Sequence, residues 1–400
     1  MGVLHLNNIK YNSLVLVIYI YFTSISLLLA PFINDYFFKS TFLICLIIAT
    51  LLLNKFKFTR KIIFFYGILT IFICLNLLFV SHKSYVIADG VNLLVYSFIP
   101  VYLIGQKVIS FTLVKKNWIR FSVLFTFLLP IFYLYRQNGY ISYYEIGFLS
   151  HLNILILVIH LVEQKRKSIK MIIFLVINVL ILAILGSRMV LVASIITSVF
   201  TFILLSNKKS FTFYLKSFLM SALVLGIVFN LREILLYINN SISKVGINSR
   251  NLSLFISQLE GRIDESTLLS GRDDIYPIII KYLGENGTFP SGFGIARKLT
   301  NGIYYHSHNF LLEMTLIFGI TGLIILVSVF LYKIFILIIS RKIGENQIML
   351  RFLLILFISF ILRSITGTYF ATDLILLVCL GIIVSINTPG IKKINNKYQH

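Results

Sequence analysis

The sequence predicts an all-α, polytopic integral membrane protein with about twelve transmembrane helices. Of its 400 residues, 58% are hydrophobic and only 12% are charged. The mean hydropathy is +0.94, and a soluble domain usually has about 25% charged residues. We therefore expect residues 1–400 to form a single membrane domain.

Apolar runs of roughly the length that crosses a bilayer follow one another along the chain. They lie at 11–30, 37–53, 62–80, 87–105, 121–135, 146–162, 171–185, 189–205, 217–233, 309–330, 351–366 and 372–388. The first run is not followed by a small-residue cleavage site, so we expect it to stay as a helix. The ninth and tenth runs are separated by the one long hydrophilic loop, 234–308.

Lysine and arginine residues cluster in every second connection between the apolar runs. The clusters lie at 55–61, 107–120, 165–170, 208–216, 341–351 and 392–397. The other connections are expected to carry Asp35, Asp89, Glu145 and Asp373. The positive-inside rule then places both termini in the cytoplasm and loop 234–308 outside it. The net charge of +22 therefore indicates loops at an anionic membrane surface and not a nucleic-acid partner.

Two short helices are expected inside the long loop. The mixed pattern at 245–259 predicts an amphipathic helix resting on the outer leaflet. A second helix is expected from Ser270, which forms a capping box with Asp273, to Gly284.

Arg272 is a candidate ligand for an anion. It lies in the first turn of the expected helix, where free backbone N–H groups already favour negative charge. Arg272 would then complete a phosphate or diphosphate site. The alternative is that it pairs with a neighbouring aspartate or with a lipid headgroup.

Arg188 is a second candidate, because Gly186-Ser187-Arg188 is the whole connection between two apolar runs. A tight turn needs glycine and serine, whereas an arginine at the membrane boundary suggests a function. The alternative is that its side chain reaches outer-leaflet phosphates.

His306 and His308 come directly before the tenth apolar run, and Asn309 is expected to cap that helix. A histidine of near-neutral pKa can take a proton from an attacking hydroxyl, which would be the role of His308. Ordinary interfacial histidines are the alternative. A His-x-His metal site with Asp273 or Asp274 is a third interpretation, and it ranks last.

Glu313 lies about one turn into the tenth helix, where a carboxylate needs a partner. Arg363 is a candidate partner, and we expect the two to form a structural ion pair that supports the site. The alternative is that Glu313 belongs to the site itself. Gly319 and Gly322 are expected to allow close helix packing. The short basic cytoplasmic loops contain no nucleotide-binding motif, so any substrate used outside must arrive activated.

In this order, the motifs resemble the bacterial O-antigen polymerase and O-antigen ligase superfamily, which comprises membrane glycosyltransferases. The resemblance rests on ordered segments: 186–188, Ser-Gly-Arg at 270–272, 289–294, and 308–322. Tyr276-Pro277 stands where the family often has Trp.

The resemblance implies a metal-independent, inverting glycosyltransferase with no cofactor, located in the bacterial cytoplasmic (inner) membrane. Its donor would be a glycan linked to undecaprenyl diphosphate. Arg188 and Arg272 would hold the diphosphate and His308 would activate the acceptor. His306, Asn309 and Arg297 would make further substrate contacts, with Ser270 in support. The implied partners are membrane lipids, a chain-length regulator and a flippase.

Three functions remain open at this stage. We favour a polymerase of O-antigen or capsular repeat units. A ligase that transfers the polymer to lipid A core is the first alternative. A polysaccharide flippase is the second, although it should show repeated halves and midplane charges.

Overall fold

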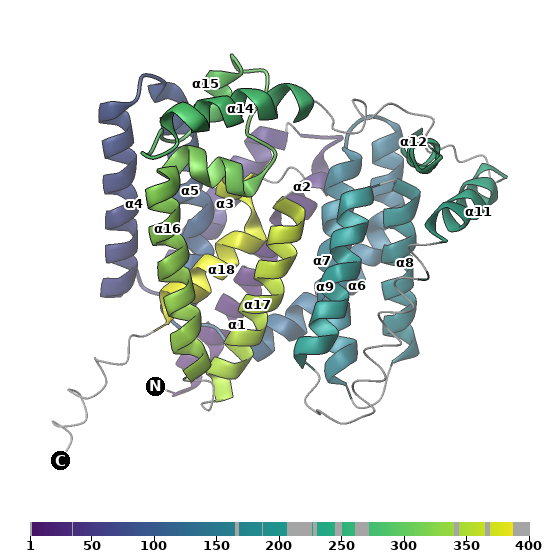
Figure 1. The fold of residues 1–400 in the computed structure, drawn as a ribbon. Coiled ribbons are helices and arrows are strands. Elements are labelled where there is room, and N and C mark those ends of the chain that lie inside the picture. Colours follow the sequence, from purple (N-terminus) through teal and green to yellow (C-terminus); the bar gives the residue numbers. More distant parts are fainter. Residues whose placement is uncertain are drawn as a thin grey trace. The chain divides into compact units, whose positions relative to one another are not determined.

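The computed structural model describes residues 2–33, 35–164, 168–185, 187–205, 226, 230–244, 250–260, 272–339, 344–364 and 369–386. Within these ranges every regular element is a helix, as Figure 1 shows. The predicted all-α class of a polytopic membrane protein is therefore confirmed. The chain gathers into two compact units. The first comprises Met1–Tyr19, Leu43–Val114 and Arg272–His400, and the second Ile20–Phe42 and Lys115–Gly271.

The first unit is built from long apolar helices with two short helices in the loop before α16. They are α1 (Gly2–Ile20), α4 (Arg60–Phe79), α5 (Lys83–Gly105), α14 (Arg272–Asn286), α15 (Ile295–Leu299), α16 (Phe310–Ile339), α17 (Gly344–Ser364), the 3-10 turn η2 (Phe370–Thr372) and α18 (Leu374–Ser385). Helix α3 (Asp35–Leu53) has residues in both units.

Helices α5 and α18 pack closely at a glycine. A Cβ atom added to Gly381 would lie 2.8 Å from the carbonyl carbon of Pro100, so only glycine allows this approach. Large apolar side chains on α4 and α16 remain exposed, among them Phe64, Leu78 and Ile325. Exposed apolar faces of this extent are typical of surfaces that meet lipid.

The second unit is centred on α7. Its helices are α2 (Phe22–Leu29), α6 (Phe111–Gln137), α7 (Tyr143–Glu163), α8 (Ile169–Leu185), α9 (Arg188–Leu205), α11 (Leu231–Ser243) and α12 (Arg250–Leu259). Polar side chains in the interior connect α6, α7 and α8 with Tyr21, the residue before α2. The Tyr21 hydroxyl donates to Asn153 (2.7 Å), Asn153 to Asn178 (3.0 Å) and Asn178 to Thr126 (2.8 Å). Hydrogen bonds between helices satisfy these groups where water is absent.

The described residues contain six helices that are long and apolar enough to cross a membrane. A seventh span results if the pair Asn7–Ile20 and Phe22–Leu29, bent by 62°, counts as one. Every predicted span except 217–233 coincides with a helix, and most of 217–233 lies outside the described residues. Several of these helices are shorter than a bilayer requires, so the count of twelve stays a prediction.

The long loop contains more helix than expected. Helix α14 is the predicted loop helix, while Ser270 lies outside the described residues. Helix α12 covers part of the predicted amphipathic segment, of which 245–249 is likewise not described. Leu252, Phe255 and Ile256 pack against Leu235 of α11 and Ala183 of α8. Its apolar face is thus covered by protein and does not rest on lipid.

Helix α16 is interrupted at Gly319, whose backbone has φ 67° and ψ 170°. The docked loop, which we define as residues 287–292, lies against the interruption. Backbone bonds run from Ser291 N to Leu316 O (3.1 Å), from Gly292 N to Ile317 O (3.1 Å) and from Ile320 N to Gly287 O (2.9 Å). Gly319 therefore makes room for a loop backbone, and the expectation that it serves helix packing is corrected.

Candidate active site

The predicted cap of α16 is present. The side-chain oxygen of Asn309 accepts hydrogen bonds from the backbone N–H groups of Leu311 (3.0 Å) and Leu312 (3.3 Å). These bonds satisfy two of the free donors of the first turn. We call residues 304–309, which lead into this cap, the histidine turn.

A side chain of α16, Glu313, also holds the histidine turn in place. Glu313 is buried, and its carboxylate accepts a hydrogen bond of 2.7 Å from the backbone N–H of Ser307. The hydroxyl of Ser307 donates to the carbonyl of Asn309 at 2.8 Å. Glu313 thus fixes the backbone between the two histidines.

His306 and His308 lie next to each other, with ring centroids 4.4 Å apart. The backbone N–H of His308 donates to Nδ1 of His306 at 3.0 Å. His308 has a left-handed backbone with φ 57°, which is uncommon for a residue with a side chain. The His306 ring also stacks on Tyr369 at 5.5 Å. His306 therefore defines the backbone geometry of His308.

Both histidines are neutral at physiological pH. Burial, followed by the proximity of His308 and the charges of Arg297 and Arg272, lowers the pKa of His306 to about 3. Burial and the charge of Arg272 also lower the pKa of His308. A neutral imidazole has a nitrogen lone pair that can accept a proton, so His308 is in the form that a general base requires.

Arg272 lies at the same end of the first unit as His308. It is the first residue of α14, and its charge acts on both histidines. Two residues later, Asp274 accepts a hydrogen bond of 3.2 Å from the Tyr304 hydroxyl. The Tyr304 ring in turn meets the His308 ring edge-on at 6.1 Å. The start of α14 and the histidine turn are thus joined directly.

Arg297 has an internal partner. It lies in α15, 8% exposed, and its guanidinium donates to Asp89 of α5, which is fully buried. The guanidinium carbon lies 4.0 Å from the ring centroid of Tyr305 and 4.9 Å from that of Tyr85. Burial alone would lower the pKa of Arg297, but the hydrogen bond and charge of Asp89 raise it overall. Arg297, expected as a substrate contact, has its charge already compensated by Asp89.

Asp89 was expected in an outer connection, and that placement is wrong. It lies within α5 and also accepts a hydrogen bond of 3.3 Å from Tyr305. Its position inside an apolar run was the one sequence signal that a buried partner existed. Tyr305 and Tyr369, which shape the histidine turn, had no such signal.

Arg363 pairs with Asp373 and not with Glu313 as expected. Its guanidinium donates to the Asp373 carboxylate at 2.6 Å, and both side chains are buried. The other oxygen of Asp373 accepts from the backbone N–H of Leu376 at 2.9 Å, which caps α18. This arrangement joins the end of α17 to the start of α18.

Arg188 belongs to the second unit. It is the first residue of α9; its side chain and Gly186 lie outside the described part of the structure. Ser187 is buried, and a Cβ added to Gly147 of α7 would lie 2.9 Å from its hydroxyl. The turn before α9 therefore packs tightly on α7.

No three His, Cys, Asp or Glu side chains within the described ranges gather as metal ligands would. The described part of the histidine turn places its two imidazoles among tyrosine rings and Arg297 instead. Its chemical resources are a neutral base at His308 and positive charge at Arg272.

A known family model matches part of the chain. The O-antigen ligase family model matches residues 173–327, a segment that contains Arg188, Arg272 and the histidine turn. A search among curated proteins gives no match. The family match and the apolar helices support a membrane protein with glycosyltransferase-like activity in the assembly of O-antigen-type polysaccharide. The matched segment is thus similar to the O-antigen ligase family, which supports the resemblance to the O-antigen ligase and polymerase superfamily that the ordered motifs predicted.

Proposed function

We propose that the protein is a polymerase that joins oligosaccharide repeat units carried on undecaprenyl diphosphate, yielding O-antigen or capsular polysaccharide. The observation that carries this proposal is that the start of α14, which bears Arg272, is joined through Asp274 and Tyr304 to His308, whose pKa is lowered by burial and by the charge of Arg272. A base and a cation together meet the two needs of glycosyl transfer from a diphosphate: removal of a proton and stabilisation of a leaving group.

In the proposed reaction, an acceptor hydroxyl oxygen attacks the anomeric carbon of the donor. His308 takes the hydroxyl proton as the new carbon–oxygen bond forms. The bond between the anomeric carbon and the diphosphate oxygen breaks, and the lipid diphosphate leaves with both electrons. Arg272 and Arg188 stabilise its charge. Direct displacement inverts the anomeric centre, and the broken bond supplies the free energy without a nucleotide or a metal.

The proposed location is the cytoplasmic (inner) membrane of a bacterium, with the reaction on its outer face. The alternating basic clusters support this orientation, because they place both termini in the cytoplasm. A flippase would deliver the donor, and a chain-length regulator would act on the product. The surrounding lipids are the remaining partners, and no role is assigned to nucleic acid.

Reconstitution tests the proposal. The purified protein in liposomes, supplied only with lipid-linked repeat units, should produce a ladder of lipid-linked polymers, including in the presence of EDTA. His308→Ala should lower the rate by roughly 100-fold to 10,000-fold, the range for loss of a general base. Arg188→Ala and Arg272→Ala should also slow the reaction, while Lys281→Ala, exposed on α14, should not. A full ladder from the His308→Ala variant would refute the mechanism.

The ligase alternative is favoured by the description of the matching family. Deletion of the gene separates the two functions on a lipopolysaccharide gel. Molecules capped with one repeat unit would support the polymerase. Uncapped core together with accumulating lipid-linked polymer would establish the ligase instead. Transport of lipid-linked units across liposomes without any ladder would indicate a flippase.

A further inference from the structure

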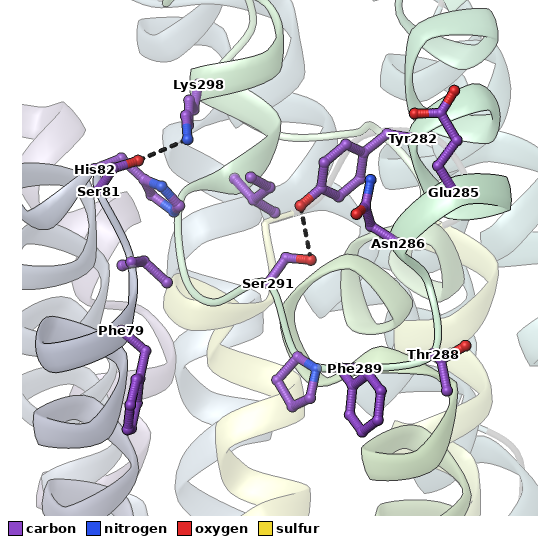
Figure 2. Close-up of a pocket in the computed structure, with 13 residues that line it drawn as sticks. Phe79, Ser81, His82, Tyr282, Glu285, Asn286, Thr288, Phe289, Ser291 and Lys298 are labelled. Atoms are coloured by element: carbon purple, nitrogen blue, oxygen red, sulfur yellow. Dashed lines mark hydrogen bonds between the residues drawn. The ribbon is translucent and has the colours of Figure 1, made fainter.

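An open pocket of about 540 Å³ lies beside the candidate active site in the first unit. Its walls are the α4–α5 turn (residues 79–82), the C-terminal end of α14, the docked loop and α15. Figure 2 shows Tyr282 and Asn286 facing the α4–α5 turn across the opening, with Phe289 below them. The volume falls within the range of sites that bind small organic molecules, about 300–1,000 Å³.

The pocket is lined by hydrogen-bond donors and acceptors, and it contains one positively charged and one negatively charged side chain, Lys298 and Glu285. Lys298 donates to the hydroxyl of Ser81 at 2.6 Å, and Tyr282 donates to Ser291 at 3.1 Å. Glu285 and Asn286 stand on the opposite wall. Because the charge of Glu285 offsets that of Lys298, the pocket does not favour an anion. A ligand with many neutral hydroxyl groups matches this mixture.

His82 also lines the pocket, and its two ring nitrogens are buried, with no hydrogen-bond partner among the described residues. Burial, together with the charge of Lys298, lowers its pKa. The aromatic rings of Phe79 and Phe289, which are 83% and 73% exposed, border the opening. Such rings give apolar surfaces against which the faces of sugar rings pack.

The pocket and the histidine turn are connected through α15. Lys298 faces the pocket, and the preceding residue, Arg297, contacts Tyr305 of the histidine turn. Neighbouring residues of one short helix thus face the pocket and contact the histidine turn.

We infer that this pocket is a saccharide-binding subsite that holds sugar residues of the glycan away from the reacting bond. The inference rests on the proposed function, since it concerns the substrate of the same site. Its role is to retain the growing chain between successive transfers. Loss of the pocket should shorten the polymers without slowing formation of the first linkage.

The test measures binding and polymer length separately. The binding probe is the free oligosaccharide released by mild acid from lipid-linked precursor of a deletion strain. It is titrated into the full-length protein in nanodiscs. The wild-type protein should bind it, and Glu285→Gln with Asn286→Ala should weaken binding by roughly fivefold to tenfold, as for one or two lost hydrogen bonds. Lys281→Gln, an exposed change on the same helix, is the matched control.

Lys298→Gln provides a second variant on the opposite wall, should the double variant unfold early in a thermal scan. Shorter ladders from either folded variant, with an unchanged rate for the first linkage, would support the subsite. Wild-type affinity in both variants would overturn it. Displacement of the oligosaccharide by inorganic pyrophosphate in wild type but not in Lys298→Gln would also overturn it, because the pocket would then bind anions. A wild-type protein that binds the oligosaccharide in the pocket yet makes no ladder would retain the subsite and refute only the polymerase.

Discussion

Arg297 donates a hydrogen bond to Asp89, although 208 residues separate them along the chain. The pair joins the loop before α16 to the interior of α5, and Tyr305 shares the same carboxylate. Because Tyr305 belongs to the histidine turn, this ion pair fixes the turn against α5. Through these side chains the pair ties α15, α5 and the turn together.

Asp89→Asn should destabilise the protein strongly. The change leaves the buried guanidinium of Arg297 without a compensating charge, which typically costs about 3–5 kcal/mol. Thermal unfolding in detergent should show a clear loss of stability, and polymer formation should fall with it.

Arg232→Gln is the matched control for this ion pair. Arg232 is 47% exposed and pairs with Glu233 and Glu260, and exposed pairs contribute little because water screens them. Equal destabilisation by both variants would show that the Asp89–Arg297 pair has no special role.

As the pH is lowered, the polymerisation rate should begin to fall only below the ordinary histidine pKa of 6.5. We call this falling part of the pH profile its acid limb. The pKa of His308 is lowered, so the base is lost only when the pH falls through that lower value. Arg272→Gln removes one cause of the shift. The remaining activity of this variant should therefore decline at a higher pH than that of wild type, measured as initial polymerisation rate against pH.

Arg272→Lys keeps the positive charge and is the control for this pH profile. Its acid limb should stay near that of wild type, even if the rate falls because lysine lacks the forked geometry of arginine. Identical limbs for Arg272→Gln and wild type would mean that Arg272 does not set the protonation of His308.

Glu313→Leu should release the histidine turn, whereas Glu313→Gln should keep it. Leucine leaves the buried N–H of Ser307 without an acceptor, which costs about 1–3 kcal/mol. Glutamine retains an acceptor oxygen. Unfolding and polymerisation assays should therefore separate the two variants. If Glu313→Gln lost as much activity as His308→Ala, Glu313 would take part in the chemistry itself.

Gly319→Ala should be poorly tolerated. A Cβ there would lie 2.6 Å from the carbonyl carbon of Phe289 and 2.7 Å from the carbonyl oxygen of Thr288. The left-handed backbone adds strain of about 1–3 kcal/mol. Gly67→Ala in α4 is the control, because nothing lies within 4 Å of its added Cβ. Thermal unfolding of the two variants should differ sharply, and equal stability would contradict the docking of residues 287–292.

Sequence patterns predicted those structural features that depend on residues close together in the chain. Apolar runs predict helices, and Asn309 before an apolar run predicts a cap, because each depends on neighbours within a turn or two. The partners of Asp89 and Arg363 depend on which distant helices pack together, and one sequence contains no direct signal of that. Asp89 inside an apolar run showed that a partner was needed but not that it was Arg297.

The interruption of α16 at Gly319 could not be predicted from the sequence, for a different reason. Gly319 and Gly322 fit the small-residue spacing of a packed helix, and nothing in the apolar sequence around Gly319 marks a break. The break depends on a loop that arrives from residues 287–292 and takes the place of intrahelical partners. Its positive φ becomes visible only in three dimensions.

The bonds between the docked loop and α16 run from backbone to backbone. Backbone bonds of this kind fix the path of the loop but do not depend on the identity of most of its side chains. Phe289 and Ser291 could therefore be exchanged for other residues while the wall of the pocket keeps its shape. Under the proposed function, a fold of this kind would separate the machinery that breaks the sugar–phosphate bond from the surface that recognises the sugars. A few substitutions in one loop would then change the glycan preference without disturbing the chemistry.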